Sequence, residues 1–171
     1  NNLFKGEWEY MVGGGVAAFD CNGDYLPELL MAGGENKATF LRNASVKGGA
    51  LKFEAQEIGL EQDKMLGAYP LDVDGDGNID VMLLRQGQNV LMRGLGGCKF
   101  ERANEGWGFD GGDAWSAAFA ATWEKGATWP TLAVGNYINR KEEFSPWGSC
   151  TDNWLHRPAP DTGKFAAPVA L

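Results

Sequence analysis

DVDGDGNID, residues 72–80, is the most informative segment of this chain, and it is called loop two below. Side-chain oxygens recur at its positions 1, 3, 5 and 9, and a backbone carbonyl lies at position 7; the residues are Asp72, Asp74, Asp76, Asp80 and Asn78. The interspersed glycines let the chain curl so that carboxylates point inward. Hard oxygen donors in this number suit Ca²⁺ better than Mg²⁺, which keeps more of its water. Since no His or Cys lies nearby to favour a softer metal, loop two is predicted to bind calcium.

The EF-hand is the main competing interpretation of this acidic pattern. An EF-hand needs a bidentate Glu at position 12 of its loop, followed by a helix. Position 12 here is Leu83, within an apolar stretch that has the character of a β-strand. The EF-hand is therefore excluded, and loop two is expected to join two strands.

A second Asp-rich stretch, DCNGDYLPE at residues 20–28, aligns with loop two without a gap and is called loop one. Its oxygen donors are the side chains of Asp20, Asn22, Asp24 and Glu28 and the backbone carbonyl of Leu26. Asn22 replaces a carboxylate, so loop one is expected to bind calcium more weakly. For either loop, the alternative is an Asp/Asn/Gly turn without a metal.

A third copy of the repeat lies at residues 115–137. Residues 117–119 align with 17–19, and residues 130–132 align with 27–29, which places three extra residues in its loop. The acidic positions are lost, and the loop is interpreted as metal-free; the residues found there are Ala120, Thr122 and Glu124.

A second element, NxLxR, recurs between the loops at residues 89–93 and 153–157. Phe40 and Arg42 fit its second half, and a short alternating strand follows it at 51–54 and 99–101. Each unit of roughly 50 residues therefore holds four short strands, which is the size and content of a propeller blade. The predicted fold is an all-β propeller with blades of four antiparallel strands.

About three blades are expected, at residues 13–57, 67–104 and 114–171, with residues 1–12 as candidate strands of an adjoining blade. Closed propellers usually have four to eight blades. The chain, 1–171, is therefore expected to be a partial propeller and a fragment of a longer protein or of an assembly.

Charge and cysteine content narrow the functional class. The chain has 23 acidic and 15 basic residues and a net charge of −8, which argues against nucleic acid and anionic membrane surfaces. No apolar run is long enough for a membrane span. Three cysteines, without metal-ligand spacing, leave open one disulfide with a spare thiol, a partner cysteine outside this chain, or three buried thiols; they are Cys21, Cys98 and Cys150.

Other signals are weaker. Gly13, Gly15 and Ala18 fit GxGxxA, but no helix follows, so a dinucleotide site is not expected. The only histidine, His156, lies in the NxLxR strand without a nucleophile elbow elsewhere, and is interpreted as structural or surface-exposed. The tryptophans concentrate near the C-terminus and are expected to pack between blades; the candidates for an exposed contact surface are Trp123 and Trp129.

Together these features resemble the FG-GAP/VCBS-type repeats of integrin-like propellers. More narrowly, the chain is similar to the cartilage-acidic-protein-like (ASPIC/UnbV-associated) family. The resemblance rests on GGGVAAFDCNGD (13–24), AYPLDVDGDGNIDVMLL (68–84), WGFDGGDAW (107–115), AVGNYINR (133–140) and SCTDNWLHRP (149–158).

This resemblance implies an exported, multi-bladed, calcium-binding propeller without an established catalytic centre, with the ligands at loops one and two. The chain departs from the family at Tyr25, where Gly is common, and at Glu28, where Asp is common. Family members also continue past the equivalent of Leu171, with a further cysteine that could pair with Cys150.

The expected function is that of a non-catalytic, calcium-binding module for adhesion, binding or structural assembly, secreted to the cell exterior or the periplasm. Its expected cofactor is Ca²⁺ and its partner a protein or glycan. The alternative is a calcium-stabilised scaffold domain of a secreted enzyme, of the polysaccharide lyase or phospholipase type, with catalytic residues elsewhere. Such an enzyme should show clustered titratable residues in a cleft facing the propeller axis. Self-association, by strand exchange or by completion with missing blades, is a third hypothesis.

Overall fold

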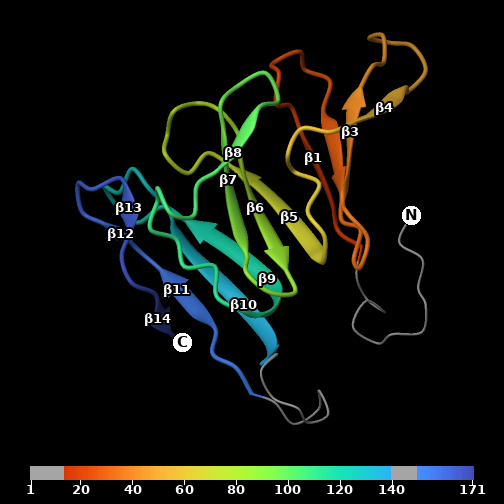
Figure 1. Cartoon of the computed structure of the whole chain (residues 1–171). Coiled ribbons are helices and arrows are strands. Elements are labelled where there is room, and N and C mark those ends of the chain that lie inside the picture. The colour runs from red at the N-terminus through yellow and green to blue at the C-terminus, as the bar shows by residue number, and fades with distance from the viewer. Residues whose placement is uncertain (1–13, 140–149) are drawn as a thin grey trace.

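The computed structural model describes residues 14–139 and 150–171, so the predicted strands within residues 1–12 lie outside it. Throughout these ranges the regular structure is β-strand, with no helix. Three four-stranded antiparallel sheets follow one another along the chain and lie side by side as blades (Figure 1). The all-β, blade-like architecture confirms the predicted fold class.

Blades one and two share one topology, in which each strand pairs with the strand before it. Blade one contains β1 (Val16–Phe19), β2 (Glu28–Met31), β3 (Thr39–Asn43) and β4 (Phe53–Gln56). Blade two contains β5 (Met65–Leu71), β6 (Asp80–Arg85), β7 (Val90–Gly94) and β8 (Phe100–Arg102). Loop one joins β1 to β2 and loop two joins β5 to β6, so the two loops occupy equivalent places.

Blade three has an insertion before its outer strand. Its sheet contains β9 (Ala114–Thr122), β10 (Thr131–Asn139), β11 (Trp154–His156) and β14 (Val169–Ala170). Between β11 and β14 lies a two-stranded hairpin of β12 (Pro158–Ala159) and β13 (Lys164–Phe165). The Phe165 amide donates to the Trp107 carbonyl at 2.7 Å, which ties this hairpin to the segment that leads into blade three.

The register of blade three corrects the predicted alignment of its loop. Thr122 pairs with Thr131, just as Phe19 pairs with Glu28 and Leu71 with Asp80. Loop three therefore runs from 123 to 131, matches the other loops in length, and does not contain extra residues. The additional residues lengthen β9 instead, whose pairing with β10 includes register shifts. Bulges of this kind absorb insertions within a strand and leave the loop unchanged.

The hydrophobic core lies between the blades. One cluster joins blades one and two and includes Phe19, Leu30, Phe40, Val81 and Leu83. The other joins blades two and three and includes Met82, Leu84, Leu91, Leu132 and Val134. Because side chains alternate along a strand, β6 supplies residues to both clusters. That position between two neighbours explains why β6 is a continuous apolar run rather than an alternating one.

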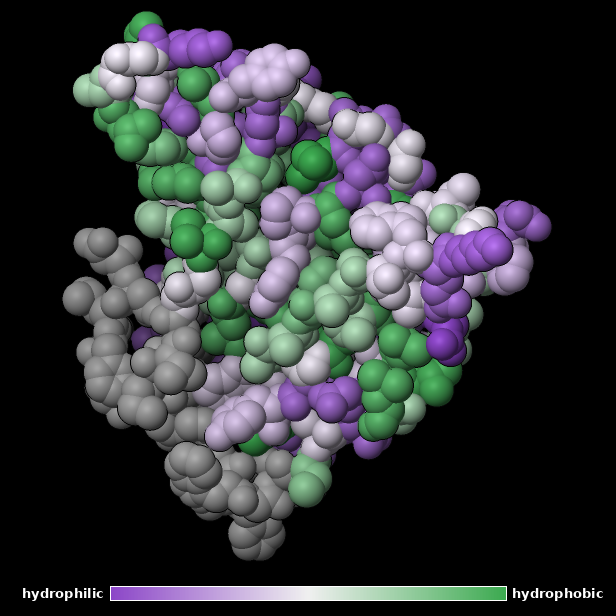
Figure 2. Space-filling model, turned by 180° about the vertical axis from the view of Figure 1, so that it is seen from behind, coloured by the Kyte–Doolittle hydropathy of each residue, from purple (hydrophilic) through white to green (hydrophobic). Residues whose placement is uncertain are grey.

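The tryptophans mainly pack between elements, as predicted. Trp107 is buried, and its ring meets that of Trp129 edge-on with centroids 5.2 Å apart. Trp129 also contacts Phe165 and is partly buried, whereas Trp123 is 48% exposed. Figure 2 shows polar and apolar residues intermixed over one face, with apolar residues gathered near its middle. Of the two tryptophans proposed as contact residues, Trp123 is the one that the fold leaves accessible.

Candidate metal centres

Loop two brings three of its predicted ligands together. One carboxylate oxygen from each of Asp72, Asp74 and Asp80 lies within 4.8 Å of the others. The amides of Gly75 and Gly77 donate to the Asp72 carboxylate at 2.9 and 3.0 Å, which fixes its orientation. Gly77 has a φ of 85°, a conformation that favours glycine.

Asp80 anchors loop two to the rest of blade two. Its side chain is fully buried and accepts the Val73 amide at 2.7 Å and the Gly94 amide at 2.8 Å. Burial raises the pKa of Asp80 to about 6, and the charges of Asp74 and Asp72 act in the same direction. A buried carboxylate beside two like charges is stabilised by a cation, so the electrostatics of loop two favour an ion.

Gly94 is placed where a side chain does not fit. A Cβ at this position would lie 2.2 Å from the Ile79 carbonyl oxygen, which belongs to the backbone and cannot rotate away. We expect Gly94→Ala to lower the free energy of unfolding by about 1–3 kcal/mol, as measured by urea denaturation. The control is Gly106→Ala, where the nearest neighbouring atom would be 3.8 Å away. Equal stability of the two variants would contradict the role of Gly94.

Arg93 is the arginine of the NxLxR motif at residues 89–93, and it faces the acidic side chains of loop two. Its Nη2 donates to Asp76 at 3.1 Å, and its Nε lies 2.8 Å from Asp74 without the alignment of a hydrogen bond. The Asn78 amide donates to the other Asp76 oxygen at 2.8 Å, and this is the main reason that the pKa of Asp76 is lowered. Asp76 thus points toward Arg93 and lies outside the three-carboxylate cluster. Asn78 is half-buried beside Gly96.

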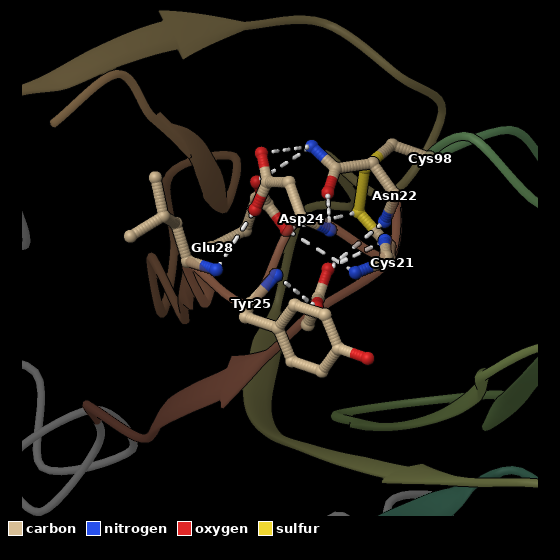
Figure 3. The surroundings of a disulfide bond; sticks show 9 residues. Cys21, Asn22, Asp24, Tyr25, Glu28 and Cys98 are labelled. Carbon is tan, nitrogen blue, oxygen red and sulfur yellow. Dashed lines mark hydrogen bonds between the residues drawn. A yellow bond between two sulfur atoms is a disulfide. The ribbon is translucent and has the colours of Figure 1, made fainter. Parts of the chain in front are cut away.

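Loop one, shown in Figure 3, has amide-to-carboxylate hydrogen bonds like those of loop two. Asp20 accepts the amides of Gly23 and Tyr25 at 2.7 and 2.8 Å, as Asp72 does at the equivalent positions. The Leu26 amide donates to Asp24 at 2.8 Å. Tyr25 has a φ of 63° and a ring that is 90% exposed. A non-glycine residue in this left-handed conformation costs roughly 1–2 kcal/mol, so loop one is more strained than loop two.

The amide of Asn22 joins two predicted ligands of loop one. Its Nδ2 donates to Asp24 at 2.9 Å and to Glu28 at 3.4 Å. Glu28 is fully buried, and its other oxygen accepts the Cys21 amide at 3.2 Å. Burial raises the pKa of Glu28, and the nearby Asp24 adds to this effect. For an ion to bind here, Asn22 must turn its oxygen toward the two carboxylates.

A disulfide connects loop one to blade two. Cys21 is bonded to Cys98 in the turn between β7 and β8, with Cα atoms 4.8 Å apart, and the Cys98 amide donates to the Cys21 carbonyl at 3.0 Å. The sulfur atoms lie close to the Glu28 carboxylate. They are not metal ligands, because a disulfide offers no thiolate. Cys150 is exposed and outside any disulfide, so the chain has one disulfide and a spare thiol.

The contacts of the NxLxR motif explain its recurrence. Its asparagine side chain accepts a backbone amide of the preceding strand: that of Arg85 donates to Asn89 at 2.9 Å, and that of Asn136 donates to Asn153 at 2.8 Å. Its arginine reaches the loop of the same blade, as Arg93 does in blade two. The recurrence was visible in the sequence, but the target of the arginine is a tertiary contact that spacing alone does not reveal.

Loop three is held by a different set of groups. Arg157, the arginine of its NxLxR motif, contacts Glu124 at 3.1 Å, and Glu124 also accepts the Thr131 hydroxyl at 2.8 Å. These two contacts, led by Thr131, lower the pKa of Glu124. Loop three is thus closed by an ion pair and a hydroxyl, at the place where the other two loops carry several carboxylates.

The donor types of loops one and two suit a hard cation, but among the described residues only loop two has three carboxylates gathered together; in loop one the group is Glu28 with the two disulfide sulfurs. All of the candidate side-chain ligands are oxygens, and Asp72, Asp74 and Asp80 already have theirs within 4.8 Å of each other. Calcium takes six to eight oxygen ligands from carboxylates, carbonyls and water. If bound, it would be held in loop two by these three residues, and its charge would offset their mutual repulsion.

Comparison with known proteins supports the class that the fold and loops define. Residues 20–83 match the family model of the FG-GAP-like repeat, from the first residue of loop one into β6. This match supports an FG-GAP/VCBS repeat domain, and such repeats are generally non-catalytic scaffold or binding modules. No curated protein matches the chain. Among the residues that the structure describes, none forms a helix long and apolar enough to cross a membrane.

Proposed function

We propose that this chain is a non-catalytic, calcium-stabilised propeller segment that serves as a binding or assembly module. The observation that carries the proposal is the convergence of Asp72, Asp74 and Asp80 within 4.8 Å in a loop between two strands. Three carboxylates at this distance repel one another, and Arg93 pairs with only Asp74 of the three, so a bound cation would offset the repulsion that is left. The ion would act structurally, because it would hold the loop that connects the two longest strands of blade two.

The proposed location is the cell exterior or the periplasm. The Cys21–Cys98 disulfide supports it, because disulfides persist in oxidising compartments and are rare in the cytosol. The narrower resemblance to cartilage-acidic-protein-like (ASPIC/UnbV-associated) proteins belongs to the same proposal.

The proposed partner is a protein or a glycan. Aromatic side chains are over-represented at contact surfaces because they bury a large area with little loss of conformational freedom. Tyr25 and Trp123, 90% and 48% exposed, place such side chains on loops one and three. Further blades, from the same or another chain, are the alternative partner for the outer faces of blades one and three.

The groups found in blade three favour a module over an enzyme scaffold. One groove of this blade, of about 390 Å³, lies between loop three and the β12–β13 hairpin. Two carboxylates line this groove: Glu124, which is already paired with Arg157 and Thr131, and Asp161, which is exposed on the hairpin. His156 is buried against the Phe109 ring, and this burial lowers its pKa. Neither Glu124 nor His156 is therefore placed as a free acid or base in a cleft.

Removal of calcium tests the proposal. A ligand at about one hundred times its Kd stabilises a protein by about 2.7 kcal/mol, which corresponds to a Tm shift of roughly 5–10 °C for a chain of this size. We expect EDTA to lower Tm by this amount relative to excess Ca²⁺. In excess Ca²⁺, Asp74→Ala should lower Tm more than Asn22→Ala.

Hydrogen exchange locates the effect. EDTA should speed amide exchange in residues 20–28 and 72–80, while residues 123–131 serve as the internal control because loop three is closed by the Arg157–Glu124 pair. Identical melting temperatures and exchange rates with EDTA and with Ca²⁺ would refute the structural role of calcium.

A further inference from the structure

Loops one and two anchor their second residue in different ways. In loop two this residue is Val73, whose side chain is fully buried in the core between blades two and three. In loop one it is Cys21, which is only half-buried, at the edge of the core between blades one and two. In both loops the backbone amide of this residue donates to the buried carboxylate at position 9, Asp80 or Glu28. The position of that amide therefore depends on core packing in loop two and on another anchor in loop one.

The disulfide is that other anchor. It fixes Cys21 to Cys98 of blade two, and the Cys98 amide also donates to the Cys21 carbonyl at 3.0 Å. Loop one also has fewer carboxylates than loop two and carries the strained Tyr25. It is thus the loop with less intrinsic tendency to hold its ligands in place.

The disulfide lies where a reductant can reach it. A cavity of about 220 Å³ separates the two loops, and its lining includes Asp20, Cys21 and Asn22 from loop one and Gly77, Asn78 and Cys98 from blade two. Both cysteines are half-buried rather than enclosed in the core. Loop one, loop two and the disulfide therefore share one opening to solvent.

We propose that the Cys21–Cys98 disulfide is a positioning element for the cation site of loop one, so that the affinity of this site depends on redox state. The inference rests on the proposed calcium function. With dithiothreitol as the reductant, its two thiols supply two electrons and two protons, the S–S bond breaks to give two cysteine thiols, and the reagent closes to a cyclic disulfide. Loop one then must order the backbone at Cys21 when it binds the ion, while loop two keeps its anchor in the core.

Site-resolved calcium titration by NMR tests the proposal. The amide of Gly23 reports on loop one and that of Gly77 on loop two, since each donates to the first carboxylate of its loop. In oxidised protein both amides should shift with Ca²⁺. After reduction, the Kd reported by Gly23 should rise about tenfold, because ordering one backbone residue costs this much. The Kd reported by Gly77 should change less than twofold. The Cys98→Ala variant should behave as the reduced protein does.

The linked measurement is the reduction midpoint of the disulfide. Binding linkage requires Ca²⁺ to make the disulfide harder to reduce by the same factor, which for tenfold is about 30 mV. An unchanged Gly23 Kd after reduction overturns the proposal, and so does an equal loss at Gly23 and Gly77, which would show that the disulfide supports the whole fold. Absence of a Gly23 response in oxidised protein removes the loop-one site itself, and absence of both responses refutes the calcium function, so the two failures are distinguishable.

Discussion

Asp80→Ala is expected to lower the free energy of unfolding by about 4 kcal/mol. The substitution leaves two buried amides, those of Val73 and Gly94, without an acceptor, and each such group costs about 1–3 kcal/mol. In calcium the loss should be larger still, since a ligand at the buried end of loop two disappears. The carboxylate belongs to β6, which lies between both core clusters, so the cost extends to both blade interfaces.

Two further variants show whether the stability loss of Asp80→Ala comes from the lost hydrogen-bond acceptors or from the lost charge. Asp80→Asn keeps one oxygen acceptor but turns its NH₂ toward the other amide, so we expect about half of the loss. Asp152→Ala is the control, because this exposed residue contributes only its backbone carbonyl to the described hydrogen bonds. Guanidinium denaturation with and without Ca²⁺ measures all three. A loss for Asp80→Ala no larger than that for Asp152→Ala would contradict its anchoring role.

Loss of the disulfide is expected to have a comparable effect on global stability. Cys21 and Cys98 are 77 residues apart, and closing a loop of this length in the unfolded chain is worth about 4 kcal/mol in the chain-entropy account. We expect the double variant Cys21→Ser/Cys98→Ser to lose about this much in guanidinium denaturation, with Ca²⁺ present in excess. Most of the effect arises in the unfolded state, so the folded blades should keep their strand content.

Cys150→Ser provides the matched control, because Cys150 is exposed and outside the disulfide. Its stability should equal that of the natural sequence. Thiol titration under denaturing conditions should find one free thiol in the unmodified chain and none in Cys150→Ser. A double variant that loses less than about 1 kcal/mol would show that the cross-link constrains neither state appreciably.

Local patterns in the sequence were sufficient for the class of fold. The Asp-rich loops, the apolar strands beside them and the NxLxR elements predict four-stranded units, and the structure has three of them. The alignment of the third loop was wrong because residues 117–119 resemble 17–19, whereas the pairing of Thr122 with Thr131 sets the true register. Identity of a few small residues could not reveal that the additional residues lengthen β9, since strand pairing depends on the partner strand.

Some features of the candidate site could likewise be predicted from the sequence, and others could not. Loop two carries its ligand types, its spacing and its glycines within nine consecutive residues, so the sequence by itself determined that oxygen atoms could converge there. The partners of loop two come from elsewhere: Gly94 donates to Asp80, and Arg93 pairs with Asp74 and Asp76. Loop one likewise depends on a distant partner, since its Cys21 is bonded to Cys98. Only the tertiary structure decided these contacts, because they require two strands, or two blades, to be placed side by side. The ligand types and their spacing lie within a short stretch of chain. The burial that raises the pKa of Asp80 and the disulfide that fixes loop one exist only after the blades have packed.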